Sequence, residues 1–432
     1  MLLKKIRQSS EVFDKLANSY EVWVPESGWL AGRRNRDKND SKRKNLTDWS
    51  ILSFLLEIDN CHYPMADSYL QYGIDGVIRI AAETLETLKN NLQSELQDQT
   101  QLDIAYLESL LHVWKRFRQF VADHMVLALE CAKQETSDTK KKCYEKIAKI
   151  CQNLTINKPN TFCEALQLFW FTYLFRSPFG AGCIGRLDQL LYPFYKHDCE
   201  MGIWDQQEAE KMLEEMFTRM NEINTGDTLR NLMLSGQDAK GNDQTNEITY
   251  LILVAYENTG GSEPHLNVRF HEKTPKKLRD NCINMLSSGS GQPTIYFDEA
   301  VLPAMEKAGI CHEDACQYAN DGCTETVIAG KSAIIFWQYE MVKTVELTLF
   351  GGNENPCVKP VSMKKNSIHG ADFVPKTNLL IGIESKKPQE LTTFSEFLSA
   401  FFEQMDHQLD HYFLMIKQKM QEETEAQITT QG

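Results

Sequence analysis

A cysteine and a glutamate two residues apart are the side chains in this sequence best suited to chemistry. Cys323 lies in the polar segment 318–326, with Gly322 before it and Glu325 two residues after it. In an extended segment, residues i and i+2 project to the same side, so Cys323 and Glu325 can face one pocket. A thiol and a carboxylate directed at one substrate suit either nucleophilic catalysis or hydrogen-atom transfer with an acid/base helper.

The two chemistries place different demands on the neighbours of the thiol. An ionic, cysteine-dependent mechanism needs a histidine base, and His312 is the histidine nearest to Cys323 in the sequence. A neighbouring carboxylate such as Glu325 disfavours the thiolate on which that mechanism depends. Hydrogen-atom transfer uses a neutral thiol, so the Cys-x-Glu spacing suits it better.

Predicted strands and helices alternate on the N-terminal side of this segment. Strand-like runs occupy residues 231–236, 265–270 and 293–297. A predicted helix follows each run: Asp243 caps the first, Thr274-Pro275 opens the second, and Asp298 starts the third. A further helix is predicted from Phe336 to Phe350. This alternation is typical of an α/β layer or barrel with functional loops at the strand ends.

The flanking regions are predicted to be helical. Apolar residues recur at helical spacing between residues 70 and 225, where Thr161 and Glu164 form a capping-box pattern. A long amphipathic helix is predicted from Phe394 to Glu423. We therefore predict a mainly helical part over 1–225, an α/β segment with the cysteine loop over 226–350, and a loop followed by a long helix over 351–432.

Composition excludes several classes of partner. The 432 residues carry a net charge of −14 and a pI near 5.3, which argues against nucleic acid or an anionic membrane surface. There is no apolar run long enough for a transmembrane helix and no apolar signal core behind the N-terminus. The 12 cysteines form no CxxC pair or zinc-type cluster, so we expect reduced thiols, no metal and a cytoplasmic location.

Residues 180–185 read Gly-Ala-Gly-Cys-Ile-Gly, a formal GxGxxG. A dinucleotide fingerprint needs a strand before it and a helix that opens at it. Here the preceding run is predicted to be helical and Pro178 interrupts the approach, so nucleotide binding is not favoured. The glycines are better explained as allowing a loop to pass close to other backbone or to a ligand.

Several stretches in a fixed order give the sequence a family resemblance between about residues 60 and 350. They are Thr-Phe-Cys-Glu-Ala-Leu-Gln at 161–167, Gly-Arg-Leu-Asp-Gln at 185–189, Tyr-Pro-Phe-Tyr at 192–195, Asn-Leu-Met-Leu-Ser-Gly at 231–236, Asn-Glu at 246–247, Glu-Pro-His-Leu-Asn-Val-Arg at 263–269, Gly-Cys-Thr-Glu at 322–325 and Val-Glu-Leu at 345–347. This set resembles the glycyl radical enzymes, the family of pyruvate formate-lyase and its dehydratase, decarboxylase and lyase relatives.

The resemblance implies a fold and a mechanism. The fold would be part of a ten-stranded α/β barrel with a largely helical N-terminal half. Cys323 would carry a transient thiyl radical that takes a hydrogen atom from a substrate carbon, and Glu325 would act as base or acid on a substrate hydroxyl or carboxyl group. A small-molecule substrate would also meet the following predicted binding residues: Cys183, His265, Arg269, Phe336 and Trp337.

Departures from the family pattern narrow the expected activity. The resemblance implies a Cys-Cys pair at this position in formate-lyases proper. In this sequence Gly322 and Thr324 flank Cys323, and this difference disfavours formate production from pyruvate. The pair Phe336-Trp337 stands where polyol dehydratases of the family place an aspartate. The pocket is therefore expected to be apolar and aromatic, which favours a decarboxylase, a lyase or another branch.

The family stores its radical on a glycine in an Arg-Val-x-Gly-aromatic segment, and these 432 residues contain no such segment. No tightly bound cofactor is expected, and the glycyl radical, installed by a radical SAM activating enzyme, would come from elsewhere. We therefore expect either a split or truncated enzyme, with a possible second polypeptide supplying the glycyl radical domain, or a catalytically inactive scaffold or partner-binding remnant.

Overall fold

A computed structural model describes residues 2–33, 66–90, 98–176, 183–222, 230–260, 263–322, 325–332, 341–353, 382–386 and 388–431. The chain divides into two compact units, Met1–Ile334 and Ile335–Gly432. Three of the predicted site residues, Cys323, Phe336 and Trp337, lie outside the described residues. The predicted division of the chain into parts that end at residues 225 and 350 stays a prediction.

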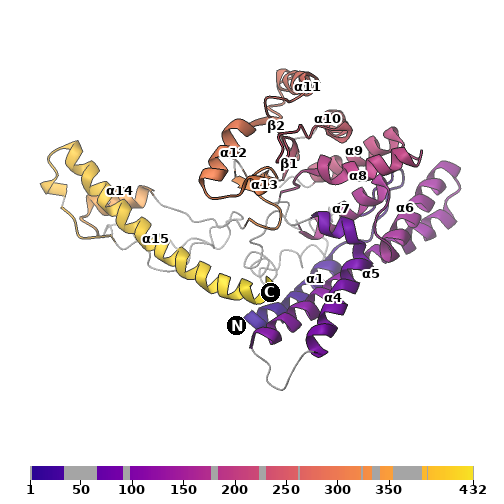
Figure 1. The fold of residues 1–432 in the computed structure, drawn as a ribbon, viewed down its shortest axis with the longest axis horizontal. Helices are drawn as coiled ribbons and strands as arrows, with labels where there is room; N and C mark the ends of the chain where they lie inside the picture. The colour runs from indigo at the N-terminus through magenta and orange to yellow at the C-terminus, as the bar shows by residue number, and fades with distance from the viewer. Residues whose placement is uncertain are drawn as a thin grey trace. The chain divides into compact units, whose positions relative to one another are not determined.

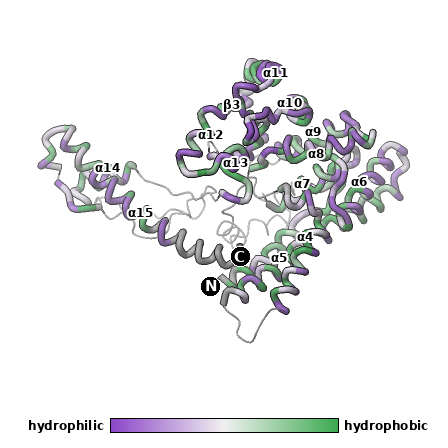
Figure 2. The backbone as a smooth tube through the Cα atoms, in the orientation of Figure 1, coloured by the Kyte–Doolittle hydropathy of each residue, from purple (hydrophilic) through white to green (hydrophobic). Residues whose placement is uncertain are grey.

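The first unit begins with helices, as predicted. They are α1 (Leu2–Ser19), α4 (Ala66–Asn90), α5 (Asp98–Gln134), α6 (Asp138–Ile156), α7 (Phe162–Arg176), α8 (Leu187–Glu200) and α9 (Gln206–Glu222). Helix α5 packs against α1, α4 and α6 (Figure 1). Hydrophobic and hydrophilic residues are interspersed along α4, α5 and α6 (Figure 2), as expected for helices with one side toward the core, whereas α7 is buried on nearly all sides.

The predicted capping box at the start of α7 is confirmed. The Thr161 hydroxyl accepts a hydrogen bond from the Glu164 backbone N–H at 3.3 Å, and the Glu164 carboxylate accepts one from the Thr161 N–H at 3.3 Å. These two reciprocal bonds satisfy backbone donors that a helix start leaves without partners. The local sequence therefore determines where α7 begins.

A three-stranded parallel sheet follows. Its strands β1 (Asn231–Ser235), β2 (His265–Phe270) and β3 (Thr294–Phe297) lie side by side in chain order. Helix α10 (Glu247–Thr259) connects β1 to β2, and α11 (Lys276–Ser287) connects β2 to β3. Asn231 is paired in register with His265, and Asn267 with Thr294. The three predicted strands are confirmed, with ends that differ by one residue at most.

Two helix starts differ from prediction. Helix α10 is capped by Asn246, whose side chain accepts from the N–H groups of Ile248 and Thr249, and not by Asp243. Asp243 instead bonds His271, with 2.9 Å between Oδ1 and Nε2. Helix α11 begins one residue after Pro275. Helix α12 (Asp298–Lys307) starts at Asp298 as predicted.

The two faces of the sheet differ in composition. Leu232, Leu234, Leu266 and Val268 belong to the main hydrophobic core, together with residues of α8 to α11. Met233, on the other face of β1, belongs to a second cluster with residues 315–316, 318–319 and 327–328. One face therefore carries the connecting helices, and the other carries α13 (His312–Ala315) and the hairpin of β4 (Ala319–Asp321) and β5 (Glu325–Val327).

The second unit contains α14 (Met341–Leu349), a short 3-10 helix (Pro388–Glu390) and α15 (Phe394–Gln431). Helix α15 starts where predicted and extends further than Glu423. Thr393 and Glu396 form its capping box, and hydrogen bonds from Thr392 and Thr393 lower the pKa of Glu396 to about 2. Helices α14 and α15 pack together, and the Thr344 hydroxyl donates to Gln408 Oε1 at 3.1 Å.

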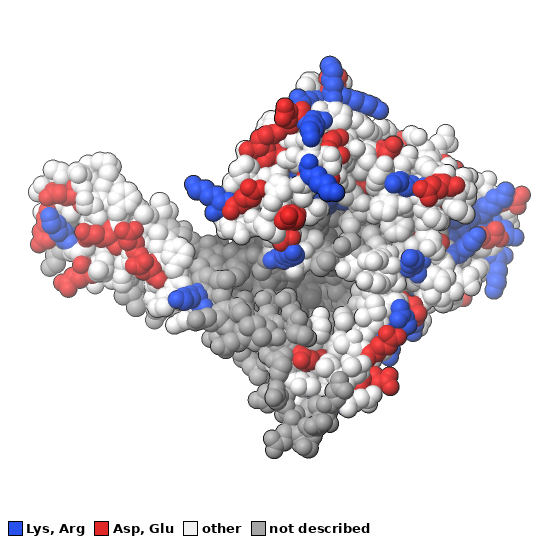
Figure 3. All heavy atoms as spheres, viewed as in Figure 1, with Lys and Arg blue, Asp and Glu red and all other residues white. Residues whose placement is uncertain are grey.

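Within the described ranges, no helix is both long and apolar enough to cross a membrane. Lysine and arginine side chains lie among aspartate and glutamate side chains on the face of the first unit shown in Figure 3. Surface ion pairs such as Lys331–Asp314, at 2.7 Å, contribute to this mixture of signs.

Candidate active site

The β4–β5 hairpin sets the place of the predicted cysteine. Asp321 and Glu325 are Cα partners in the antiparallel ladder, as are Asn320 and Thr326. In the sequence, Cys323 lies between Gly322, which follows β4, and Thr324, which precedes β5. We call Gly322 and the adjoining ends of β4 and β5 the tip of the hairpin. The Cys323 side chain lies outside the described residues, and the common pocket for Cys323 and Glu325 stays a prediction.

Gly322 explains why a glycine precedes the cysteine. Its φ of 57° lies in the left-handed region, which side chains disfavour. A Cβ atom at this position would also lie 2.5 Å from Oε2 of Glu325. The Glu325 carboxylate therefore folds back onto the backbone of Gly322, next to the peptide that leads into Cys323.

The base of the hairpin is anchored by an ion pair that is fully withdrawn from solvent. Arg269 on β2 contacts Asp298 through Nε–Oδ1 and Nη2–Oδ2 distances of 2.8 Å, and both side chains are 0% exposed. Arg269 Nη1 donates to the Cys316 carbonyl at 2.9 Å, and its guanidinium lies 4.0 Å from the Tyr318 ring centre. The Tyr318 hydroxyl donates to Asp298 at 3.0 Å, and burial raises the pKa of Tyr318.

These contacts favour a positioning role for Arg269. Its guanidinium donates hydrogen bonds to Asp298 and to the backbone that leads into β4, so a substrate carboxylate would have to compete with these acceptors. His265 lies four residues earlier on the same face of β2, roughly 13 Å away at the usual strand rise. The structure therefore places His265 at the tip end of the hairpin and Arg269 at its base, and substrate binding by either remains a prediction.

Cys183 is buried in the second hydrophobic cluster, with Met233, Tyr318 and Val327. It directly precedes Ile184, whose N–H donates to the Asn231 carbonyl at 2.7 Å. The structure thus brings Cys183 to the hairpin's side of the sheet, and substrate binding by Cys183 stays a prediction. A contact with substrate is not tested by this placement.

Arg186 and Asp188 form structural links at the end of β1. Arg186 Nη2 donates to the Ser235 carbonyl at 2.8 Å, and Asp188 Oδ2 accepts from the Ser235 N–H at 2.8 Å and from the Thr249 hydroxyl at 2.7 Å. Ser235 has a φ of 63°, which a non-glycine residue rarely adopts, and these bonds hold it there. Complete burial raises the pKa of Asp188.

Both ring nitrogens of His312 already contact other groups. Its Nδ1 lies 2.6 Å from Glu306 Oε1, and its Nε2 lies 3.2 Å from the Ala239 carbonyl and 3.6 Å from Cys316 Sγ. The hydrogen bond to Glu306 raises the pKa of His312. These contacts favour a protonated, structural histidine over a general base.

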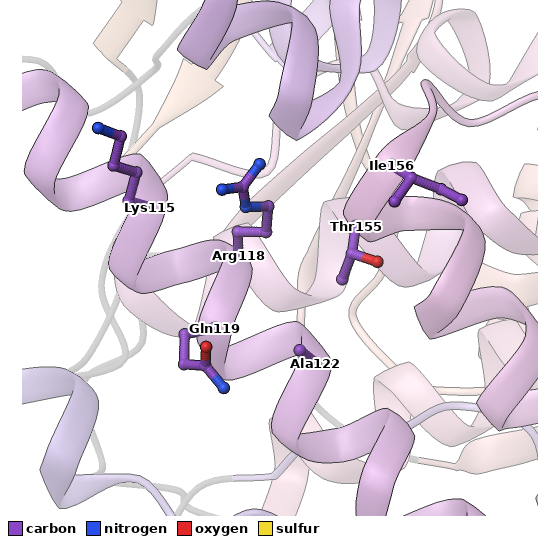
Figure 4. Close-up of a pocket in the computed structure, with 6 residues that line it drawn as sticks. All are labelled: Lys115, Arg118, Gln119, Ala122, Thr155 and Ile156. Carbon is purple, nitrogen blue, oxygen red and sulfur yellow. The ribbon is translucent and has the colours of Figure 1, made fainter.

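A cavity of about 450 Å³ lies elsewhere, between α5 and α6 (Figure 4). Its lining residues are Lys115, Arg118, Gln119, Ala122, Thr155 and Ile156. None of the predicted site residues belongs to it. In the part of the chain that the structure describes, no three His, Cys, Asp or Glu side chains gather as a metal site.

Two residues important to this region were missed by sequence reasoning. Asp298 was identified only as a helix start, although its carboxylate also forms an ion pair with Arg269 on β2. Asn231 was recognised only as part of the family motif at residues 231–236. Its side-chain amide donates a hydrogen bond to the Gly322 carbonyl at 2.8 Å. A polar residue inside an otherwise apolar buried strand, as at Asn231, was the available signal.

The described site combines a parallel sheet, helices on one of its faces and a hairpin on the other, and comparison with known proteins gives the family. The family model described as pyruvate formate lyase-like matches residues 60–428. The chain belongs to this family of glycyl radical enzymes.

Among curated relatives, trans-4-hydroxy-L-proline dehydratase of Clostridioides difficile is 31% identical over 66% of this chain and 36% of its own length. Isethionate sulfite-lyase of Oleidesulfovibrio alaskensis is 28% identical over 72% of this chain and 37% of its own. The chain thus spans about a third of these relatives. Among solved structures, the glycerol-bound B12-independent glycerol dehydratase from Clostridium butyricum has a TM-score of 0.74 at 21% identity, covering 94% of this chain and 58% of that one.

Proposed function

We propose that this chain provides the reactive cysteine and the acid/base side chain of a glycyl-radical-type lyase, dehydratase or decarboxylase that acts on a small organic substrate. The observation that carries the proposal is the hairpin tip, where Glu325 folds over Gly322 directly beside the position of Cys323. The dehydratase and sulfite-lyase activities of the relatives support the same reaction class.

Cys323 would exchange a hydrogen atom with the substrate. In its thiyl form it takes the atom from a substrate carbon, so that an S–H bond forms and a C–H bond breaks. After the substrate radical loses its leaving group, the thiol returns the hydrogen atom to the product radical and becomes a thiyl again. A neutral thiol is required, and a nearby carboxylate favours that form over the thiolate.

Glu325 would move the proton. As a carboxylate it accepts a proton from a substrate hydroxyl or carboxyl group while the bond to the leaving group breaks. As a carboxylic acid it returns that proton to a departing hydroxide, so the chain ends in its starting state. Its position on β5, opposite Asp321, holds it on a strand and not on a loose loop.

We also propose that β1, β2 and β3 belong to a ten-stranded α/β barrel. Consecutive parallel strands with connecting helices on one face match the wall of such a barrel, in which helices lie outside and strands line the interior. The β4–β5 hairpin on the other face would then lie inside. A closed barrel excludes water and oxidants from a radical site.

The proposal needs a glycyl radical from a segment outside these 432 residues, and a radical SAM activase to install it. That radical supplies the unpaired electron with which Cys323 begins each turnover. The residues at the hairpin are compatible with such a radical donor. Arg269 holds the base of the hairpin, and the Glu325 carboxylate lies against Gly322.

The test is anaerobic turnover of the activated protein, with all co-purifying chains, on small hydroxylated and sulfonated compounds. Cys323→Ser should abolish turnover, because a hydroxyl hydrogen is bound too strongly for this exchange. Cys199→Ser, at an exposed cysteine on α8, is the matched control and should retain it. Full turnover by the Cys323→Ser variant would overturn the proposal in favour of a scaffold or partner-binding role.

A further inference from the structure

Three buried asparagines from three strands meet at the tip of the cysteine hairpin. They are Asn231 on β1, Asn267 on β2 and Asn320 on β4, and their exposed fractions are 1%, 3% and 1%. A buried amide is costly unless it is hydrogen-bonded, so such a cluster between the parallel sheet and the hairpin calls for an explanation.

Asn231 is the centre of the cluster. Its Oδ1 accepts hydrogen bonds from Nδ2 of Asn267 and from Nδ2 of Asn320, each at 3.1 Å. Its Nδ2 donates to the backbone carbonyl of Gly322 at 2.8 Å. With two donors on the oxygen and a carbonyl on the nitrogen, only one orientation of this amide satisfies all three bonds.

We infer that Asn231 is a positioning residue for Cys323, an inference that rests on the proposed function of that cysteine. The Gly322 carbonyl and the Cys323 nitrogen belong to one planar peptide group, so fixing the carbonyl oxygen also fixes the bond that leads into Cys323. Asn231 therefore fixes the carbonyl of the residue that directly precedes Cys323.

The hydrogen bond from Asn231 at the tip limits a movement that the contacts at the base of the hairpin would allow. Arg269 and Asp298 hold the backbone at residues 316–318, before β4 begins. A hairpin held only at its base can pivot, and the displacement is largest at its tip. Asn231 lies at the start of β1, which is the end of the strand that faces the tip, and it removes this freedom.

The test compares two variants of the activated holoenzyme. Asn231→Asp keeps the shape and the oxygen that accepts from Asn267 and Asn320 but removes the donor to Gly322. Asn267→Ala is the matched control, because it removes one amide from the cluster and leaves the Asn231–Gly322 bond in place. Asn231→Ser, which buries no charge, is the second variant if Asn231→Asp does not fold.

We expect kcat per glycyl radical spin to fall about a hundredfold in the Asn231 variants with little change in KM, because misplacing a reacting atom by about 1 Å costs that much. Asn267→Ala should keep most of its kcat. In the protein before activation, amide hydrogen exchange in a peptide covering residues 320–326 should be about tenfold faster in the Asn231 variants, as loss of a buried hydrogen bond allows.

Unchanged kcat and unchanged exchange in folded Asn231 variants would overturn the inference, as would an equal loss in Asn267→Ala. The result is separable from that of the proposed function. If Cys323→Ser abolishes turnover and the Asn231 variants remain fully active, only the inference fails. If Cys323→Ser remains active, the proposed function fails whatever the exchange at the tip shows.

Discussion

At the scale of single residues, His124 is a titratable ring enclosed by aromatic side chains. Its Nδ1 donates to the Phe120 carbonyl at 2.8 Å, and its Nε2 accepts from the Trp23 N–H at 3.3 Å. The rings of Phe120 and Phe171 lie 4.5 and 4.9 Å away. Both nitrogens are satisfied in the neutral form, and burial lowers the pKa of His124 to about 4.

This burial predicts an acid-sensitive contribution to stability. An unfolded histidine has a pKa of 6.5, so between pH 6.5 and 4 the unfolded chain binds a proton that the folded chain does not. The contribution of neutral His124 to the free energy of unfolding should therefore be complete above pH 6.5. It should decrease by about 3 kcal/mol as the pH falls from 6.5 to 4. His124→Gln should flatten this slope in urea unfolding measured from pH 7 to pH 4, whereas parallel profiles for the two proteins would contradict the prediction.

Arg269 shows what sequence can determine about a single residue. The alternation along residues 265–270 places Arg269 on one face of a strand, and the family resemblance implied that it binds substrate. The carboxylate that it binds is Asp298, 29 residues later and in the element that follows the next strand. Periodicity within one strand does not show which side chain the neighbouring element will direct at it.

At the scale of elements, the tip of the hairpin depends on a glycine for two separable reasons. Gly322 and Gly260, the residue after α10, have almost the same φ, 57° and 58°. A Cβ at Gly260 would have no atom within 4 Å, whereas a Cβ at Gly322 would meet the Glu325 carboxylate. The pair therefore separates the backbone cost of an alanine from its steric cost.

Gly260→Ala should lower the free energy of unfolding by about 1–2 kcal/mol, the cost of a left-handed residue. Gly322→Ala should cost more, because Glu325 must also move. In a Glu325→Ala background the extra cost should disappear, giving a coupling energy of about 0.5 kcal/mol or more in a double-mutant cycle. Denaturant unfolding of the four proteins measures it. Additive effects would mean that Glu325 does not rest on Gly322.

Local sequence was sufficient for the longer elements. The strand His265–Phe270 and the start of α15 at Phe394 were predicted to the residue, because strand alternation and amphipathic helical spacing are local patterns. The β4–β5 hairpin was predicted only as a polar loop. Its strands have three residues each, too few for alternation to show, and they are held by contacts with β1 and Arg269 that are distant in sequence.

At the scale of the whole molecule, the order of short motifs predicted the family, and the family model confirms it over residues 60–428. The number of strands in the barrel stays a proposal, since the described residues show three parallel strands and one hairpin. The division at residue 334 was not predicted. It depends on which segments pack together.

That division leads to a prediction about independent folding. Both hydrophobic clusters of the first unit, from Leu16 to Ile328, lie within residues 1–334, and the buried residues of α14 and α15 pack with one another. A fragment of residues 1–334 should therefore unfold cooperatively, because its core does not need the second unit. Near-UV circular dichroism and urea unfolding of the fragment and the full chain test this. His124→Gln in the fragment should flatten the acid slope as it does in the full chain. A fragment with helical far-UV signal but no near-UV signal and no cooperative transition would show that the second unit is required to fix the first.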